Sequence, residues 1–325
     1  MKIKPLYGKF GMEPTYYPTY IKHIHPFWNE PLYGESDGAY EGFITPAVDA
    51  MDNLMGNTTH PWAHEFHNDE ECLECSTPVY SDRKEFEKHW VSALKILNAH
   101  GFVESSKVCM DAEGGCHLSF DMEAMFDNFI SKVKGPNEAK ELCERFMKNF
   151  LIFIRNNPSI VWAFLSPYDN ESAEITFDSA NPSNLTKGHF LNASRTSKSI
   201  PGQDLPDSHR FGGSTHWEYY YRMELRFFMM PRSFSEMKFH LDFGNHLMHY
   251  IHDLTFNKEI VLVDINNIYK IIKYTFPKAL TNLRKVSKEI GIDPRLFAEF
   301  GKIKLMKQRF GFAKKNPAFL LNQDI

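Results

Sequence analysis

The chain has 325 residues, of which 42% are hydrophobic and 14% aromatic, so it can bury a substantial core. Its formal net charge of −4 at pH 7 argues against non-specific binding to nucleic acid or to an anionic membrane. The sequence contains no apolar run of about 20 residues, its first residues lack the apolar core of a signal peptide, and its odd number of cysteines fits a reducing compartment. We therefore expect a cytoplasmic protein without a membrane span.

The first predicted strand covers residues 6–13 and delivers Glu13. Residues 14–61 are rich in Pro, Gly, Tyr and His without a sustained period, which predicts a long loop or insertion. A strand pair follows at residues 62–67 and 72–80, joined by a polar turn.

The next part of the sequence, from Asp82 to about Asn156, is predicted to contain three helices and two strands. Asp82 is typical of the N-cap of a helix that ends near Gly101, and the apolar residues between them recur at helical spacing. The elements expected after it are strands at 103–110 and 116–120, a helix from Asp121 to about Lys134 and a helix from Pro136 to about Asn156.

The second half begins with residues 166–214, where Asn, Ser, Pro and Gly predict a loop that packs over the site. The later elements are a strand at 219–228, helices at 233–255, 266–274, 277–290 and 294–300, and a tail at 302–325 that we expect to be peripheral.

The strand at 219–228 is dense in aromatic and branched residues and has no Gly or Pro. Because side chains alternate along a strand, Arg222, Glu224 and Arg226 share one face. Charged side chains are rarely buried unless they are paired or bound to something. This face is therefore either a surface ladder of ion pairs or part of a binding site.

Gly114 and Gly115 directly precede the strand at 116–120 and allow a tight turn or a close approach of the backbone to a ligand. On that strand His117 and Ser119 share a face. A single histidine on a strand is more often structural than a ligand, but the two glycines favour a site here.

The predicted strand pair also places polar residues together. Glu65 and His67 fall on one face of the first strand, and Glu74 shares a face with Cys72 on the second. Cys72 and Cys75 form a C-x-x-C, but no second such pair occurs and both lie in a strand, so we do not expect structural zinc.

These strands together offer Glu13, Glu65, Glu74, His117, Glu224 and Arg226. Carboxylates with one histidine suit a hard divalent ion that keeps open positions for phosphate oxygens. Arginines suit polyphosphate, because the guanidinium group can bind phosphate oxygens with two hydrogen bonds. The absence of Walker, G-x-G-x-x-G and G-x-S-x-G motifs weakens P-loop, Rossmann and α/β-hydrolase interpretations.

The helix at 233–255 carries four histidines, including His246, His249 and His252. Each step of three residues falls about 60° short of a full turn of the helix, at 3.6 residues per turn, so the three side chains drift around the helix. We therefore do not expect these histidines to form a metal site.

The order of four motifs resembles the amidoligase family, which belongs to the glutamine synthetase and glutamate–cysteine ligase superfamily of carboxylate–amine ligases. That family shows an F-G-x-E-x-E strand, an E-x-x-[ST]-P strand before a long helix, a G-G-x-H-x-[HS] strand and a late E-F-R strand. The corresponding segments are FGME at 10–13, ECSTPV at 74–79, GGCHLS at 114–119 and MELRFF at 223–228. Each motif is short, and their order and spacing carry the resemblance.

The resemblance implies an α+β fold, with an antiparallel curved sheet of the glutamine synthetase catalytic type, helices packed on one face and a helical C-terminal part. The implied division is a domain at 1–260 with loop insertions at 14–61 and 166–214, followed by a helical extension at 261–325. ATP and two magnesium ions would lie on the concave face of the sheet.

The implied activity is ATP-dependent ligation, in which ATP phosphorylates a carboxylate and an amine attacks the acyl phosphate to form an amide or isopeptide bond. The implied metal ligands are Glu13, His117, Glu224 and Glu74, with Glu65 as a further candidate. The implied catalytic residues are Arg226, Glu74 and Arg195, and the implied nucleotide contacts are Arg226, Arg222, Gly114 and Gly115. The substrates would be carboxylates and amines, on small molecules or on protein side chains, and relatives in this family occur in phages and bacteria.

Two positions depart from the family pattern. Thr15 stands where the second acid of the first strand is expected, and Ser119 stands where many members have a second histidine. One metal position is therefore weakened, or is supplied by Glu65 or His67. Two alternatives stay open, namely a non-catalytic binding or structural protein descended from the same fold and a guanidino-type phosphotransferase.

Overall fold

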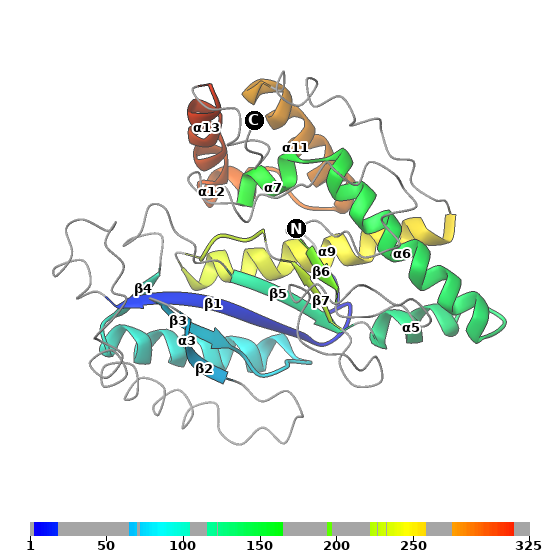
Figure 1. Cartoon of the computed structure of the whole chain (residues 1–325), viewed down its shortest axis with the longest axis horizontal. Coiled ribbons are helices and arrows are strands. Elements are labelled where there is room, and N and C mark those ends of the chain that lie inside the picture. The colour runs from blue at the N-terminus through cyan, green and yellow to red at the C-terminus, as the bar shows by residue number, and fades with distance from the viewer. Residues whose placement is uncertain are drawn as a thin grey trace.

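The structure of the protein, a computed structural model, describes residues 3–18, 65–69, 72–104, 116–121, 123–164, 194–196, 222–225, 227–231, 233–257 and 275–314. Its strands are β1 Phe10–Pro18, β2 Glu65–Asp69, β3 Cys72–Ser76, β4 Phe102–Glu104, β5 Cys116–Asp121, β6 Ser194–Thr196 and β7 Arg222–Leu225. They form one antiparallel sheet in the order β2-β3-β1-β5-β7-β6, and β4 pairs with the end of β1 (Figure 1).

The helices of the described residues are α3 Arg83–Ala99, α5 Glu123–Ile130, α6 Pro136–Asn156, α7 Ser159–Phe164, α9 Phe234–Asn257, α11 Phe276–Ile290, α12 Arg295–Glu299 and α13 Lys302–Ala313. The chain is thus an α+β protein with an antiparallel sheet, as the resemblance implies. Within this described part, none of the helices is long and apolar enough to cross a bilayer.

One face of the sheet is apolar and packs against α3. Phe10 and Tyr16 of β1 are buried and share this face. The ring of Phe10 lies 5.3 Å from that of Phe86, and the ring of Tyr16 lies 6.4 Å from that of Trp90, measured between centroids. Asp82 caps α3 by accepting a hydrogen bond from the backbone N–H of Lys84, so the expected cap and helix are confirmed.

The long helix α9 covers the rest of the apolar face. Gly244 of α9 lies against Leu118 and Phe120 of β5 and Leu225 of β7. On its other side α9 contacts α6 and α11, so it lies between the sheet and the second group of helices (Figure 1). Because α9 is covered on both sides, even polar residues such as Asn245 are fully buried.

We expect Gly244→Ala to lower the free energy of unfolding by roughly 1–3 kcal/mol, the usual cost of forcing extra carbon into a packed core. An added Cβ would lie 2.5 Å from Leu118 Cδ2 and 3.1 Å from Phe120 Cε2. The matched control is Gly311→Ala in α13, where no described atom lies within 4 Å of the new carbon. There the change should stabilise the helix by about 0.5–1 kcal/mol. Urea unfolding measures both, and equal effects at the two positions would contradict the close packing of α9.

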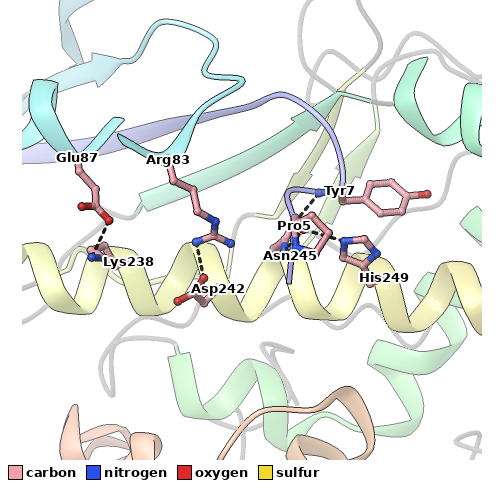
Figure 2. Close-up of polar contacts among 8 residues, drawn as sticks. All are labelled: Pro5, Tyr7, Arg83, Glu87, Lys238, Asp242, Asn245 and His249. Carbon is pink, nitrogen blue, oxygen red and sulfur yellow. Dashed lines mark hydrogen bonds and ion pairs between the residues drawn. The ribbon is translucent and has the colours of Figure 1, made fainter. Parts of the chain in front are cut away.

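Polar contacts tie α9 to α3, as Figure 2 shows. The Arg83 guanidinium at the start of α3 lies 2.5 Å from an Asp242 carboxylate oxygen. One turn along each helix, Lys238 Nζ lies 2.7 Å from Glu87 Oε1. These pairs place α3 and α9 side by side on the same face of the sheet.

The segment before β1 is held by α9 as well (Figure 2). Asn245 donates from Nδ2 to the Pro5 carbonyl and accepts at Oδ1 from the Tyr7 backbone N–H. The three histidines with three-residue spacing have separate partners. His246 Nδ1 contacts the Ile290 carbonyl, His249 Nε2 the Pro5 carbonyl and His252 Nδ1 the Tyr7 hydroxyl.

His252 should make stability depend on pH. Its ring is buried and stacks 4.3 Å from Phe129, and its Nδ1 lies 2.8 Å from the Tyr7 hydroxyl oxygen. Burial first, and then the nearby charge of Lys132, lower the pKa of His252 from 6.5 to about 4. The unfolded chain therefore takes up this proton at a higher pH than the folded protein does.

The contribution of His252 to stability is fully present above the pKa that this residue has in the unfolded chain. It is lost as the pH falls through the lower pKa that the residue has in the folded protein. The loss between these limits is up to about 3 kcal/mol, at 1.36 kcal/mol per pKa unit. We expect urea unfolding to show this slope in the wild type, and a smaller slope in His252→Leu, which has no proton to bind. An unchanged slope in the variant would assign the pH dependence to other groups.

Several predicted boundaries are wrong, and the first concerns β1. The strand does not end at Glu13 but continues through Pro14 to Pro18, into the predicted loop 14–61. Pro14 is the last β1 residue opposite β5, and β1 then pairs with β3 and β4. The missing N–H of proline therefore falls where the strand changes partner, so it interrupts little of the ladder.

Other corrections concern neighbouring elements. Asp121 is not a helix cap but the end of β5, because its N–H continues the ladder by donating to the Lys9 carbonyl. β6 lies within the predicted loop 166–214. The strand pair is confirmed as a β2–β3 hairpin, with bounds shifted to Glu65–Asp69 and Cys72–Ser76.

The tail from residue 302 is not peripheral, at least as far as it is described. It forms α13, in which Lys302, Met306, Arg309 and Phe310 are buried. This helix contacts α7, α11 and α12, so it belongs to the helical layer behind α9.

Candidate functional site

The second face of the sheet carries the polar positions, and Glu13 and His117 lie at its centre. They are directly opposite each other in the β1–β5 ladder. His117 Nδ1 lies 3.2 Å from Glu13 Oε2, and the two side chains are 15% and 14% exposed. The structure thus brings together two residues that the sequence predicts as metal ligands.

A row of four positions crosses the sheet beside this pair. Ser119 of β5 is opposite Gly11 of β1 on one side and opposite Glu224 of β7 on the other. Glu224 is in turn opposite Arg195 of β6. Because directly opposed residues share a face, and Ser119 is two residues from His117, the whole row lies on the face of the Glu13–His117 pair.

The row contains a buried hydroxyl, that of Ser119. The residue is 7% exposed, and its hydroxyl has no hydrogen-bond partner among the described residues. Next to it, a Cβ on Gly11 would meet only Thr77 among the described residues, at an ordinary contact distance of 3.7 Å. A buried hydroxyl without a partner costs about 1–3 kcal/mol, which an accepting oxygen above Gly11 and Ser119 would offset.

On the other side of β1 the hairpin continues the polar face. Thr15 is opposite Glu74 of β3, and Glu74 is opposite His67 of β2. Cys75 is fully buried, and position 74 beside it belongs to the opposite face of the strand. The same register places Glu65 on the polar face, opposite Ser76.

Arg222 of β7 is opposite Asp121 of β5 and therefore also belongs to the polar face. For Glu65, Glu74, Arg195, Arg222 and Glu224 the structure describes the strand positions. Gly114, Gly115 and Arg226 lie outside the described residues. In the described part of the chain, no three His, Cys, Asp or Glu side chains gather as a metal site. The expected convergence of the candidates on one cavity therefore stays a prediction.

Cys116 lies directly below the site, on the apolar face of β5. Burial, and then the negative charge of Glu13, raise the pKa of its thiol well above the ordinary range. The thiol is therefore protonated and is no nucleophile at neutral pH. Neighbouring positions on this strand thus lie on opposite faces of the sheet, with Cys116 in the core and His117 on the polar face.

Sequence reasoning missed two features of this face. The sequence did not predict that Arg195 pairs with Glu224, because a three-residue strand among Asn, Ser and Lys residues carries almost no strand signal. It also missed that Gly11 lies next to the buried Ser119 hydroxyl, because only the pairing of β1 with β5 places these residues together.

The sequence matches no protein-family model and no curated protein. Among solved structures, the chain is similar to a novel glutamine synthase homolog, with 13% identity, a TM-score of 0.44, and 97% of this chain and 69% of that chain covered. It is also similar to GmaS in a complex with ADP, with 12% identity, a TM-score of 0.44, and 95% and 70% of the two chains covered. A likeness of this degree does not identify the family of the chain.

Proposed function

We propose that the protein is an ATP-dependent carboxylate–amine ligase whose active site is the polar face of the sheet. The observation that carries this proposal is the Glu13–His117 pair, joined across β1 and β5. Around it, one face holds further positions with acids and arginines, from four other strands. A carboxylate–imidazole pair next to acids and arginines is the combination that a metal-bound polyphosphate needs.

The residues of this face fit magnesium and ATP. Glu13 and His117 supply an oxygen and a nitrogen donor for one cation, and the acids at positions 74 and 224 lie on the same face. Ser119 supplies a buried hydroxyl that can donate to a phosphate oxygen. When bound, ATP and magnesium would supply the phosphoryl group that activates the carboxylate and the positive charge that stabilises its transfer.

The protein's own residues would then have separate tasks. Glu13 and His117 hold the cation, and their mutual contact fixes the orientation of the imidazole. Arg195, Arg222 and Arg226 neutralise phosphate and carboxylate oxygens, with Arg226 placed by sequence parity alone. The buried wall behind them, including Cys116, excludes water from the back of the sheet.

A turnover screen tests the proposal. Purified protein is incubated with ATP, magnesium and mixed panels of carboxylic acids and amines, and both ADP release and amide formation are measured. The proposal requires ADP release that depends on both the acid and the amine, with a product lighter by one water than their sum. A phosphorylated guanidine would indicate a phosphotransferase instead. The absence of nucleotide binding in calorimetry would indicate a binding or structural protein.

A further inference from the structure

The helices α11, α12 and α13 differ in charge from the rest of the protein. Residues 275–314 contain ten Lys and Arg residues and three Asp and Glu residues, which gives a formal charge of +7. The whole chain has a formal charge of −4, so the other 285 residues have −11. The net charge of the chain does not reveal this asymmetry, because the acidic remainder outweighs the basic helices.

Most of these cations are on the surface. Two of the ten are buried and eight are exposed. Two of the exposed ones have a carboxylate close by, since Arg295 pairs with Asp293 and Lys285 Nζ lies 3.8 Å from Glu289 Oε1. The other six have no ion pair within the described part of the chain, and we call them the basic surface: Lys278, Arg284, Lys288, Lys304, Lys307 and Lys314.

The basic surface follows the outer sides of two helices. The buried residues of α11 recur on one face, and at about 100° per residue Lys278, Arg284 and Lys288 lie on the opposite face. Lys288 follows Lys278 by ten residues, and Lys314 follows Lys304 by the same interval. At 1.5 Å per residue, each helix therefore carries a row of cations about 15 Å long.

The two rows belong to one layer of the molecule. α11 and α13 contact each other, and the ring of Phe276 lies 6.1 Å from that of Phe310, measured between centroids. In Figure 1 these helices lie at the edge of the molecule away from the strands, with α9 between them and the sheet. A partner can therefore bind the basic surface without covering the polar face of the sheet.

The composition of this layer favours a nucleic acid as the partner. The exposed large hydrophobic side chains of the described residues are Ile3, Val91 and Ile130, and none of them belongs to α11, α12 or α13. Protein interfaces usually have an apolar core, and stable attachment to a membrane needs an apolar or lipid anchor besides basic residues. Nucleic acids need neither, because contacts with backbone phosphates supply essentially all of the affinity of sequence-independent binding.

We propose that the basic surface binds the phosphate backbone of double-stranded nucleic acid without sequence specificity. Each row of cations matches about four base pairs of a duplex, at roughly 3.4 Å per base pair. The acidic remainder of the chain repels the same phosphates, so the duplex binds on this side of the molecule. The binding needs neither ATP nor a metal ion and is independent of the proposed ligase activity.

Fluorescence anisotropy tests the proposal with labelled duplexes of DNA and of RNA, in the absence of ATP. Salt is varied from roughly 50 to 200 mM, because phosphate contacts make the affinity depend on salt. Six cations that each neutralise one phosphate give a slope of log K against log salt of about −5, and we expect a slope between about −3 and −5. Equal affinities indicate recognition of phosphate alone, and tighter binding of RNA indicates additional contacts with its 2′-hydroxyl groups.

The triple variant Lys278→Gln/Arg284→Gln/Lys288→Gln removes the row on α11. Each lost phosphate contact reduces the salt slope by about 1, so the slope should become shallower by about 2–3. The affinity at the lowest salt should fall at least about 10-fold. ATP-dependent turnover should not change, because these residues lie on the other side of α9 from the sheet.

The matched control is Lys84→Gln/Lys88→Gln/Lys95→Gln, which removes the same charge from three exposed lysines on one face of α3. Its salt slope should equal that of the wild type. Both triple variants change exposed side chains, so their melting temperatures should remain close to that of the wild type. If the α11 variant does not fold, Lys304→Gln/Lys307→Gln on α13 gives the same comparison, with a slope that is shallower by about 1–2.

Three results would overturn the proposal. The first is a wild type that binds neither duplex at the lowest salt. The second is an equal loss of affinity in the α11 and α3 variants, which would reflect the net charge of the protein. The third is binding to phosphatidylserine vesicles but to neither duplex, which would assign the basic surface to a membrane. Each of them leaves the ligase proposal intact, since turnover tests that separately.

Discussion

Replacement of Glu13 with glutamine is expected to reduce ATP-dependent turnover at least about 10²-fold, since even groups that only orient a metal ligand contribute roughly 10–100-fold. Glutamine has nearly the same shape but no charge, so the change removes the negative charge of a cation ligand while it preserves the packing of β1. The Glu13 side chain is 14% exposed and lies 3.2 Å from His117 Nδ1. The measurement is ADP release together with the melting temperature.

The control for this variant is Glu85→Gln, the same chemical change at an exposed position in the first turn of α3. We expect its turnover and melting temperature to equal those of the wild type. If Glu13→Gln melts several degrees lower but turns over normally, then the Glu13–His117 pair is structural. Unchanged turnover and stability would remove Glu13 from the site altogether.

Replacement of Lys302 with methionine is expected to destabilise the protein by about 3–5 kcal/mol, the usual cost of breaking a buried ion pair by removing one of its members. Lys302 is completely buried, and its Nζ lies 2.6 Å from Glu236 Oε1 and 2.9 Å from His240 Nε2. The same ammonium lies 5.3 Å from the centre of the Phe164 ring. Urea unfolding measures the loss.

A double variant separates the charge from the packing. Lys302→Met/Glu236→Leu removes both charges, and replacing a buried pair by apolar residues is often neutral or stabilising by roughly 1–4 kcal/mol. We therefore expect the double variant to recover most of the stability that Lys302→Met loses. If the double variant is less stable than the single one, the side chain of Lys302 stabilises the core mainly through contacts other than its pair with Glu236.

The candidate site could be predicted in part from the sequence because strand parity is local. Alternation alone places His117 and Ser119 on one face and Cys116 on the other, and the structure has this arrangement. The contact between Glu13 and His117 needed more, because these residues are 104 positions apart. Motif order suggested that they meet, and only the pairing of β1 with β5 places them opposite each other.

The sequence by itself determined the elements whose signals lie within a few residues. The Asp82 cap and the helical spacing of Phe86 and Trp90 define α3, and Pro136 marks the start of α6, because caps and periodic apolar residues act within one or two turns. The polarity of each strand face was determined in the same way, since it depends only on alternation.

The tertiary structure alone decided the features that depend on distant partners. Pro14 stays in β1 because the strand changes neighbours there, and Lys302 is buried because Glu236 and His240 of α9 satisfy its charge. The row from His67 to Thr15 exists because β3 lies between β2 and β1. A local pattern cannot specify such arrangements, because the free energy of a proline, a buried charge or an exposed carboxylate depends on groups that folding brings from elsewhere in the chain.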